Sequence, residues 1–144
     1  AHPRLTVVAH RHLVQVRSTD LDWLGHVNNT AFPVFFQEAR VALQHGWRGG
    51  LRHDEVDTVM ARLEVDHLRQ LHLRAEPVAV DTVVERLGRT SFTYRHTVQD
   101  PDGDVVYAVG RSVMVLVDRE TAKPVPLIDS LREHLAQFAD GPAS

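Results

Sequence analysis

The stretch DLDWLGHVNN, residues 20–29, sets two carboxylates and a histidine in a short polar segment that directly precedes an amphipathic pattern. Pro33 falls in the first turn of that pattern, where its missing N–H removes no intrahelical bond, and Gly46 follows the last periodic residue. The stretch therefore predicts a loop that leads into a helix of about four turns over residues 30–45. The apolar residues that recur at helical spacing are Phe32, Phe35, Phe36, Ala39 and Leu43.

The predicted loop and helix start combine two chemical functions. A helix N-terminus presents unpaired backbone N–H groups and the positive end of the macrodipole, which can hold an oxyanion. A carboxylate beside it can attack a carbonyl carbon or activate water. Asn28 and Asn29 are N-cap candidates at this point of the chain. The combination suggests acyl chemistry.

The regions on both sides of this helix have the pattern of strands. Residues 12–17 precede the loop as a first strand, and residues 62–68 alternate between apolar and polar side chains after the helix. This order predicts an α+β fold, an antiparallel sheet covering one long helix, with hairpins at Gly88 and at residues 101–103. The remaining predicted elements are strands over residues 78–87, 90–98 and 105–117 and a short C-terminal helix over residues 126–138, with Asp129 or Ser130 in its first turn.

Composition limits the classes of function. With 144 residues and no linker-like stretch, we expect a single domain over residues 1–144. A 43% hydrophobic content without a long apolar run predicts no membrane association. A formal net charge of −3 with scattered basic residues predicts no binding to nucleic acid. The first ten residues lack the apolar core of a secretory signal, so we expect a cytoplasmic location.

Cysteine and histidine content bears on metals and nucleophiles. The chain has no cysteine, which excludes disulfides, cysteine-ligated metals and a cysteine nucleophile. Among ten histidines, the His10-x-His12 pair stands without a further ligand set, so we expect surface histidines and no metal site.

Three segments together resemble one family. They are the DxDxxGHVNN motif of residues 20–29, the FFxEAR sequence of residues 35–40 and the GRTSF sequence of residues 88–92. Over nearly the whole chain, they are similar to the hotdog-fold thioesterases of the 4-hydroxybenzoyl-CoA thioesterase type. The resemblance implies an antiparallel sheet wrapped around a central helix and active sites at the interface of a homodimer or homotetramer. It also implies an acyl-CoA or acyl-carrier-protein thioester as substrate, with no cofactor because coenzyme A is part of the substrate.

The resemblance assigns roles within the motif. It implies that Asp22 is the catalytic carboxylate, as nucleophile or general base, and that the backbone N–H near Asn29 polarises the thioester carbonyl. His26 could orient the loop, contact substrate or act as an acid–base group, and we favour the orienting role. For Asp20 we expect a structural role in the turn.

Further residues are candidates for substrate contact. Asn28 could position the loop or a water, or serve only as a helix cap. Trp23 could line an acyl pocket or seal a subunit interface. The resemblance makes the turn after the third predicted strand a contact for CoA, although ordinary surface arginines explain its charge equally. Ser91 is not a candidate nucleophile because it lacks a Gly-x-Ser-x-Gly context. The candidates in and beside this turn are Arg86, Arg89, Thr90 and Ser91.

Two alternative functions stay open. Hotdog dehydratases that act on 3-hydroxyacyl thioesters use a histidine and a helix carboxylate, which here would be His26 and Glu38. The other alternative is a binding protein for acyl-CoA without turnover. For Glu38 we expect a pairing with Arg40 or with a partner subunit instead of catalysis. The sequence of one chain does not identify the acyl group or the thiol carrier, and it does not distinguish a dimer from a tetramer.

Overall fold

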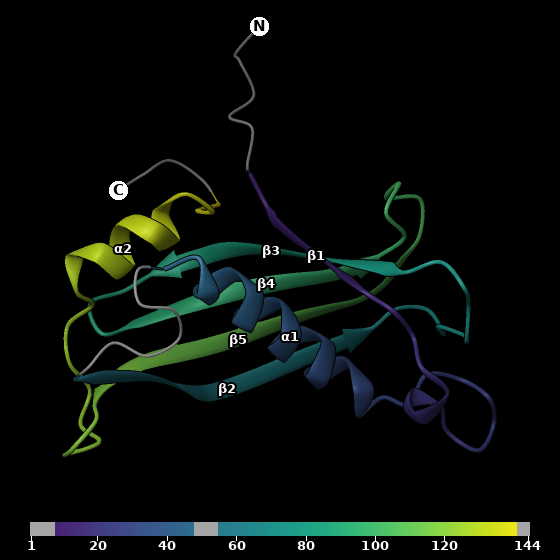
Figure 1. Ribbon diagram of the computed structural model, residues 1–144, viewed down its shortest axis with the longest axis horizontal. Coiled ribbons are helices and arrows are strands. Elements are labelled where there is room, and N and C mark those ends of the chain that lie inside the picture. Colours follow the sequence, from purple (N-terminus) through teal and green to yellow (C-terminus); the bar gives the residue numbers. More distant parts are fainter. Residues whose placement is uncertain (1–7, 48–54, 141–144) are drawn as a thin grey trace, which may run out of the picture.

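The computed structural model describes residues 8–47 and 55–140, and five antiparallel strands form its sheet. The sheet order is β1-β3-β4-β5-β2, so β3, β4 and β5 form a meander while β1 and β2 take the two edges (Figure 1). This sheet confirms the expected antiparallel hairpins. The strands are β1 (His10–Val14), β2 (Val56–His67), β3 (Val78–Leu87), β4 (Ser91–Gln99) and β5 (Val106–Asp118).

One long helix crosses a face of this sheet. Helix α1 (Ala31–His45) lies over the strands in Figure 1, and the short helix α2 (Asp129–Ala136) lies beside the far end of β3. A 3₁₀ turn, η1 (Ser18–Asp20), leads into the motif loop. The α+β class, the sheet wrapped around a long helix and the short C-terminal helix are therefore confirmed.

Alternation along the strands builds the core under α1. In β4, alternate side chains from Phe92 to Val98 are buried, and Phe36 of α1 packs on this face. Gly110 of β5 lies directly below Phe36, where an added Cβ would come within 2.3 Å of the Phe36 ring. Only glycine allows the helix to approach the sheet this closely.

A buried polar chain crosses the same face. His96 is fully buried between Thr82 and Ser112, with 2.9 Å from Nδ1 to Thr82 Oγ1 and 3.1 Å from Nε2 to Ser112 Oγ. Burial lowers the pKa of His96 to about 3, so the ring is neutral at pH 7. The expectation of surface histidines is therefore wrong for His96, because a neutral imidazole with both nitrogens hydrogen-bonded is compatible with a core.

Several predicted boundaries need correction. Strand β1 starts at His10 and ends at Val14 instead of spanning residues 12–17, because its pairing with β3 ends where the chain turns into η1. Strand β2 begins at Val56 and not at residue 62. Its first half pairs with β5, but apolar and polar side chains do not alternate regularly there, so the pattern did not predict a strand. Helix α2 is shorter than the predicted 126–138, since the Leu127 N–H bonds the Arg89 carbonyl before the helix begins.

The other predicted elements agree with the structure to within one residue. They are α1, β3, β4 and β5, predicted over residues 30–45, 78–87, 90–98 and 105–117. Residues 1–7 of the segment considered for a signal, and the predicted loop at residues 48–50, lie outside the described residues. In the part of the chain that is described, no helix is both long and apolar enough to cross a bilayer.

Candidate active site

The motif loop holds the Asp22 carboxylate in one position. Asp22 Oδ1 accepts hydrogen bonds from the backbone N–H of Leu24 at 2.9 Å and of His26 at 3.0 Å. The Asp22 N–H donates to the His26 carbonyl at 2.7 Å, and Gly25 closes the turn with a φ of 84°. Such a φ favours glycine, which explains the glycine of the motif.

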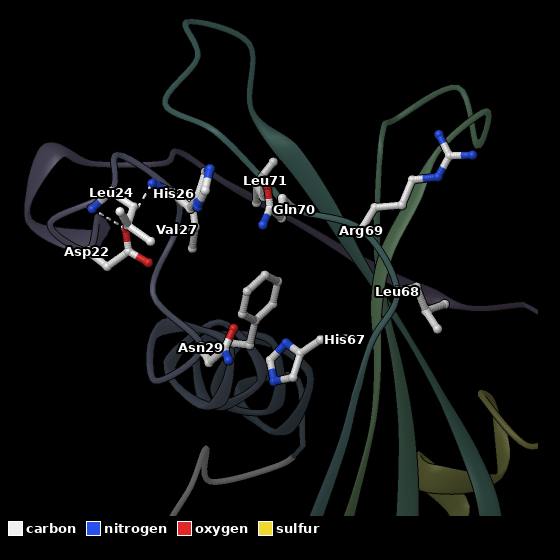
Figure 2. A pocket seen from close by; sticks show the side chains of 11 residues that line it. Asp22, Leu24, His26, Val27, Asn29, His67, Leu68, Arg69, Gln70 and Leu71 are labelled. Atoms are coloured by element: carbon white, nitrogen blue, oxygen red, sulfur yellow. Dashed lines mark hydrogen bonds between the residues drawn. The ribbon is translucent and has the colours of Figure 1, made fainter.

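The second oxygen of Asp22 faces a cavity. Within the described residues Oδ2 accepts no hydrogen bond, and Figure 2 shows it directed toward the space near Asn29 and His67. The cavity has a volume of about 360 Å³ at the N-terminal end of α1. Its lining residues are Asp22, Leu24, His26, Val27, Asn29, Phe32, His67, Leu68, Arg69, Gln70 and Leu71.

The start of α1 differs from the predicted cap. The N-cap residue is Thr30, and neither Asn28 nor Asn29 occupies that position. The reason is a tight turn at Asn28, whose Oδ1 accepts the Thr30 N–H at 3.0 Å while its carbonyl accepts the Ala31 N–H at 2.8 Å. Among the described residues the Asn29 N–H has no hydrogen-bond partner. The helix start thus presents an unpaired donor at the cavity.

Asp20 has the structural role expected of it. Its carboxylate is buried and accepts three hydrogen bonds from Arg17, from the backbone N–H at 2.8 Å, from Nη2 at 3.0 Å and from Nε at 3.4 Å. Its carbonyl accepts the Asn28 N–H at 2.8 Å. Asp20 therefore ties the turn η1 to the base of α1 and leaves Asp22 as the acid that reaches the cavity.

His26 fixes the acid through its backbone and lines the cavity with its ring. The ring packs edge-on against His72, with centroids 5.0 Å apart. Within the described residues neither ring nitrogen of His26 has a hydrogen bond. The orienting role expected of His26 therefore belongs to its main chain, and the ring is free to meet a ligand.

Sequence reasoning missed the segment after β2 as part of the site. Residues 67–71 form one wall of the cavity, and the Val27 N–H bonds the Leu71 carbonyl at 2.8 Å. Leu71 is almost fully buried, although its neighbours Gln70 and His72 are exposed. Leu71, an apolar residue between polar neighbours, was the one sequence signal that the segment after β2 packs on the motif loop.

Trp23 does not line the cavity of the single chain. Its side chain is 92% exposed, and Leu24 takes a place in the cavity wall instead. The Asx turn at Asp22 points the side chain of Trp23 outward. The other expectation for Trp23, a contact with a second subunit, stays a prediction.

The turn predicted to contact CoA lies at the other end of the sheet. Arg86 and Arg89 are exposed, the Ser91 carbonyl accepts the Gly88 N–H at 2.7 Å, and the Thr90 carbonyl accepts from Leu116. None of these residues lines the Asp22 cavity. One chain does not bring the turn and the acid together, so contact with substrate stays a prediction for Arg86, Arg89, Thr90 and Ser91.

The side chains of Glu38 and Arg40 lie in different places and do not pair with each other. Arg40 Nη1 donates to Ser112 Oγ at 3.2 Å, so the expected pairing with Glu38 is wrong; the guanidinium instead turns toward the sheet. Glu38 is exposed on a groove beside β1, apart from the cavity that His26 lines. The two residues of the dehydratase alternative are therefore not brought together within one chain.

The described residues also bear on metal binding. Across residues 8–47 and 55–140, no group of three or more histidine, aspartate or glutamate side chains is arranged to hold a metal ion. The polar residues that line the cavity are Asp22, His26, Asn29, His67, Arg69 and Gln70.

The chain is similar in sequence to known proteins. The family model described as the thioesterase-like superfamily matches residues 16–135. A relative from Bacillus subtilis (strain 168), the uncharacterized protein YsmA, is 28% identical over 122 residues, covering 85% of this chain and 82% of the relative.

Solved structures give the same result. A structure described as a predicted thioesterase from Bacillus stearothermophilus superposes with a TM-score of 0.82 at 30% identity, covering 94% of this chain and 100% of the other. A thioesterase from Thermus thermophilus, solved with coenzyme A and Zn, superposes with a TM-score of 0.73 at 34% identity, covering 92% of this chain and 96% of the other.

Proposed function

The chain belongs to the thioesterase-like superfamily, and we propose that it hydrolyses the thioester of an acyl-CoA with Asp22 as the catalytic carboxylate. The observation that carries the proposal is the pairing of an acid and a donor at one cavity. Asp22 keeps one oxygen free toward the cavity, and Asn29, whose N–H has no partner among the described residues, lines the same cavity. Hydrolysis of a thioester needs an oxygen delivered to the carbonyl and a donor for the developing oxyanion.

Two versions of the reaction are consistent with this arrangement. As nucleophile, Asp22 Oδ2 attacks the thioester carbon, the C–S bond breaks, and the CoA thiolate departs. The acyl group is then joined to Asp22 as a mixed anhydride, which water hydrolyses to the free acid and the Asp22 carboxylate. As general base, Asp22 takes a proton from water while that oxygen attacks, and the proton then passes to the departing thiolate. In both versions the Asn29 N–H would stabilise the tetrahedral oxyanion.

His26 and the neighbouring wall would position the substrate. The His26 main chain fixes Asp22 through two hydrogen bonds, and its ring faces the cavity. Asn28 would support the donor by holding the turn before α1. The coenzyme A seen with the Thermus thermophilus thioesterase supports CoA as the carrier over a carrier protein.

We also propose that the cavity is completed by a second copy of the chain, in a homodimer. Strand β2 is an edge of the described sheet, with Val59 and Met60 exposed along it. Leu24, which lines the cavity, and its neighbour Trp23 both expose apolar side chains. An unpaired edge strand and exposed apolar side chains are features that a subunit interface covers.

The direct test is release of free thiol from a panel of aliphatic and aromatic acyl-CoA esters. Asp22→Asn keeps an oxygen that can accept from Leu24 and His26, so the loop should persist while the reactive oxygen is lost. We expect kcat to fall about 10²–10⁴-fold. Asp104→Asn, an exposed aspartate in the turn between β4 and β5, outside the cavity and away from the β2 edge, is the matched control and should keep full activity. Equal turnover by native protein and Asp22→Asn would remove Asp22 from the mechanism.

A further inference from the structure

A second hollow lies between α1 and the beginning of β2, away from the Asp22 cavity of the same chain. Its volume is about 390 Å³. Val41, Val59 and Met114 give it apolar walls, and Arg40 places a guanidinium among them. The lining residues, which define the Arg40 groove, are Arg40, Val41, Gln44, Asp57, Thr58, Val59 and Met114.

Arg40 differs from the other half-buried arginines of the described residues. It makes one hydrogen bond, to the neutral hydroxyl of Ser112, and no carboxylate of the described residues lies within ion-pair distance. A guanidinium carries five N–H donors, so most donors of Arg40 stay available. The other half-buried arginines each have an anion or a carbonyl, in the pairs Arg74–Asp100, Arg95–Asp140, Arg111–Glu85 and Arg132 with the Gly88 carbonyl.

The hydrogen-bonded side chains next to Arg40 position its guanidinium but do not neutralise its positive charge. Ser112 Oγ, which accepts from Arg40, lies 3.1 Å from Nε2 of the neutral His96. Burial lowers the pKa of Arg40, although a guanidinium stays protonated at any physiological pH. A half-buried cation without a counter-ion carries a desolvation cost that an anionic ligand would offset.

The rest of the groove limits which anion fits. Thr58 Oγ1 donates to Gln44 Oε1 at 3.2 Å, and Gln44 Nε2 donates to the Tyr94 hydroxyl at 3.0 Å, so these side chains form a fixed wall. Asp57 already pairs with Arg119 at 3.2 Å, and its charge disfavours a doubly charged phosphate more strongly than a singly charged carboxylate. One planar guanidinium beside hydrocarbon walls matches a single carboxylate at the end of an apolar chain.

The proposed dimer would bring this groove to a second active site. If two copies pair their β2 edges antiparallel about a twofold axis, the His67 end of one β2 faces the Val56 end of the other. Figure 1 shows β2 running along the edge of the sheet, with its His67 end toward the motif loop. The Asp22 cavity of one copy then lies beside the Arg40 groove of its neighbour.

We propose that the Arg40 groove binds a carboxylate at the far end of the acyl group, so that the preferred substrates are CoA thioesters of dicarboxylic or other acid-terminated acyl groups. This inference rests on the proposed thioesterase function and names its substrate class.

The test compares thioesters of matched length that end in a carboxylate or in a methyl group. For native protein we expect the carboxylate series to have the higher kcat/KM. Arg40→Met should lower kcat/KM for that series about tenfold to a hundredfold, mainly through KM, and leave the methyl series unchanged. Arg40→Lys should restore part of the preference because it keeps the charge. Arg111→Met is the matched control, since Arg111 lies on the opposite face of β5 and pairs with Glu85.

Three results would overturn the inference. One is an equal loss for both series in Arg40→Met, and another is no carboxylate preference in the native protein. The third is an Arg40→Met penalty that vanishes when pantetheine replaces CoA, because Arg40 would then bind a phosphate of CoA. A thermal melt of each variant identifies any loss that comes from unfolding.

A binding measurement on native protein keeps the inference testable without turnover. Adipate should shift the side-chain Nε–H resonance of Arg40 in a protein NMR spectrum, and 1-hexanol, which has no carboxylate, should not. If no thioester is hydrolysed but adipate shifts this signal, the proposed reaction fails and the anion site stands. If thioesters are hydrolysed and adipate leaves the signal unchanged, the site fails and the reaction stands.

Discussion

The two ends of helix α1 are built in opposite ways. At the C-terminal end, Leu43 and Trp47 are almost fully buried beneath Leu131 and Leu135 of the α2 region. A nitrogen of the His134 ring lies 2.7 Å from the Leu43 carbonyl, which closes the helix end. At the N-terminal end, Phe32 is buried as well, but Trp23 and Leu24 of the motif loop are exposed and a cavity opens beside Asp22.

The difference separates the end where the molecule gains stability from the end where we propose that it binds ligands. Burying apolar surface stabilises a fold by roughly 25 cal/mol per Å², so the α2 end contributes much of the core. Exposed apolar side chains such as Trp23 and Leu24 gain nothing in a single chain. They become favourable only when a substrate or a second copy covers them. Three predictions test this contrast between a sealed end and an open end.

The largest effect should come from the sealed end. Leu131→Ala leaves a cavity among buried side chains of α1 and the sheet, and it should lower the free energy of unfolding by about 2–5 kcal/mol. Urea denaturation measures this change. Leu68→Ala at the open end removes a largely exposed side chain and should change stability by less than about 0.5 kcal/mol. Similar losses in the two variants would erase the contrast.

Trp23 should contribute to assembly and not to folding. Trp23→Ser should weaken self-association by about 2–4 kcal/mol, at least roughly thirtyfold in Kd, because an exposed tryptophan at an interface is a typical hot spot. Sedimentation equilibrium measures the Kd, and Leu13→Ser, an exposed position on β1, is the control. An unchanged Kd would place Trp23 outside the interface.

His96 of β4, which stacks under Phe36 in the middle of α1, should give a pH effect on stability of about 2 kcal/mol. Burial lowers the pKa of His96 to about 3, whereas an unfolded histidine titrates near 6.5, so the unfolded chain binds more protons as the pH falls below 6.5. Between pH 7 and pH 5 the free energy of unfolding should drop by about 2 kcal/mol from this group alone.

In His96→Gln this contribution disappears. The stability difference between native protein and variant should therefore shrink by the same amount over that range. Urea denaturation at a series of pH values measures it, and parallel curves would contradict a buried neutral imidazole.

Local patterns predicted the helix and the central strands well, because burial repeats regularly in them. Strand β3 agrees at both ends, and α1 begins one residue later than predicted. The edge strands β1 and β2 were placed less accurately, since their ends depend on where pairing with β3 and β5 stops. A periodicity read from one strand contains no information on its partner.

The candidate site was predicted in part for a similar reason. Asp22, His26 and Asn29 lie within one short segment, and the structure places all three at one cavity. The wall at residues 67–71 comes from a distant part of the chain, through the hydrogen bond between Val27 and Leu71. The position of Arg40 was also out of reach, because its hydrogen bond to Ser112 spans 72 residues.

The central claim is that the open end carries the chemistry while the sealed end carries the stability. One paired measurement tests it most directly, kcat/KM for the best acyl-CoA and the free energy of unfolding in both Asp22→Asn and Leu131→Ala. We predict that Asp22→Asn loses turnover with nearly native stability, and that folded Leu131→Ala keeps its turnover with reduced stability. Full turnover by Asp22→Asn, or a loss of turnover in folded Leu131→Ala as large as that in Asp22→Asn, would contradict the account.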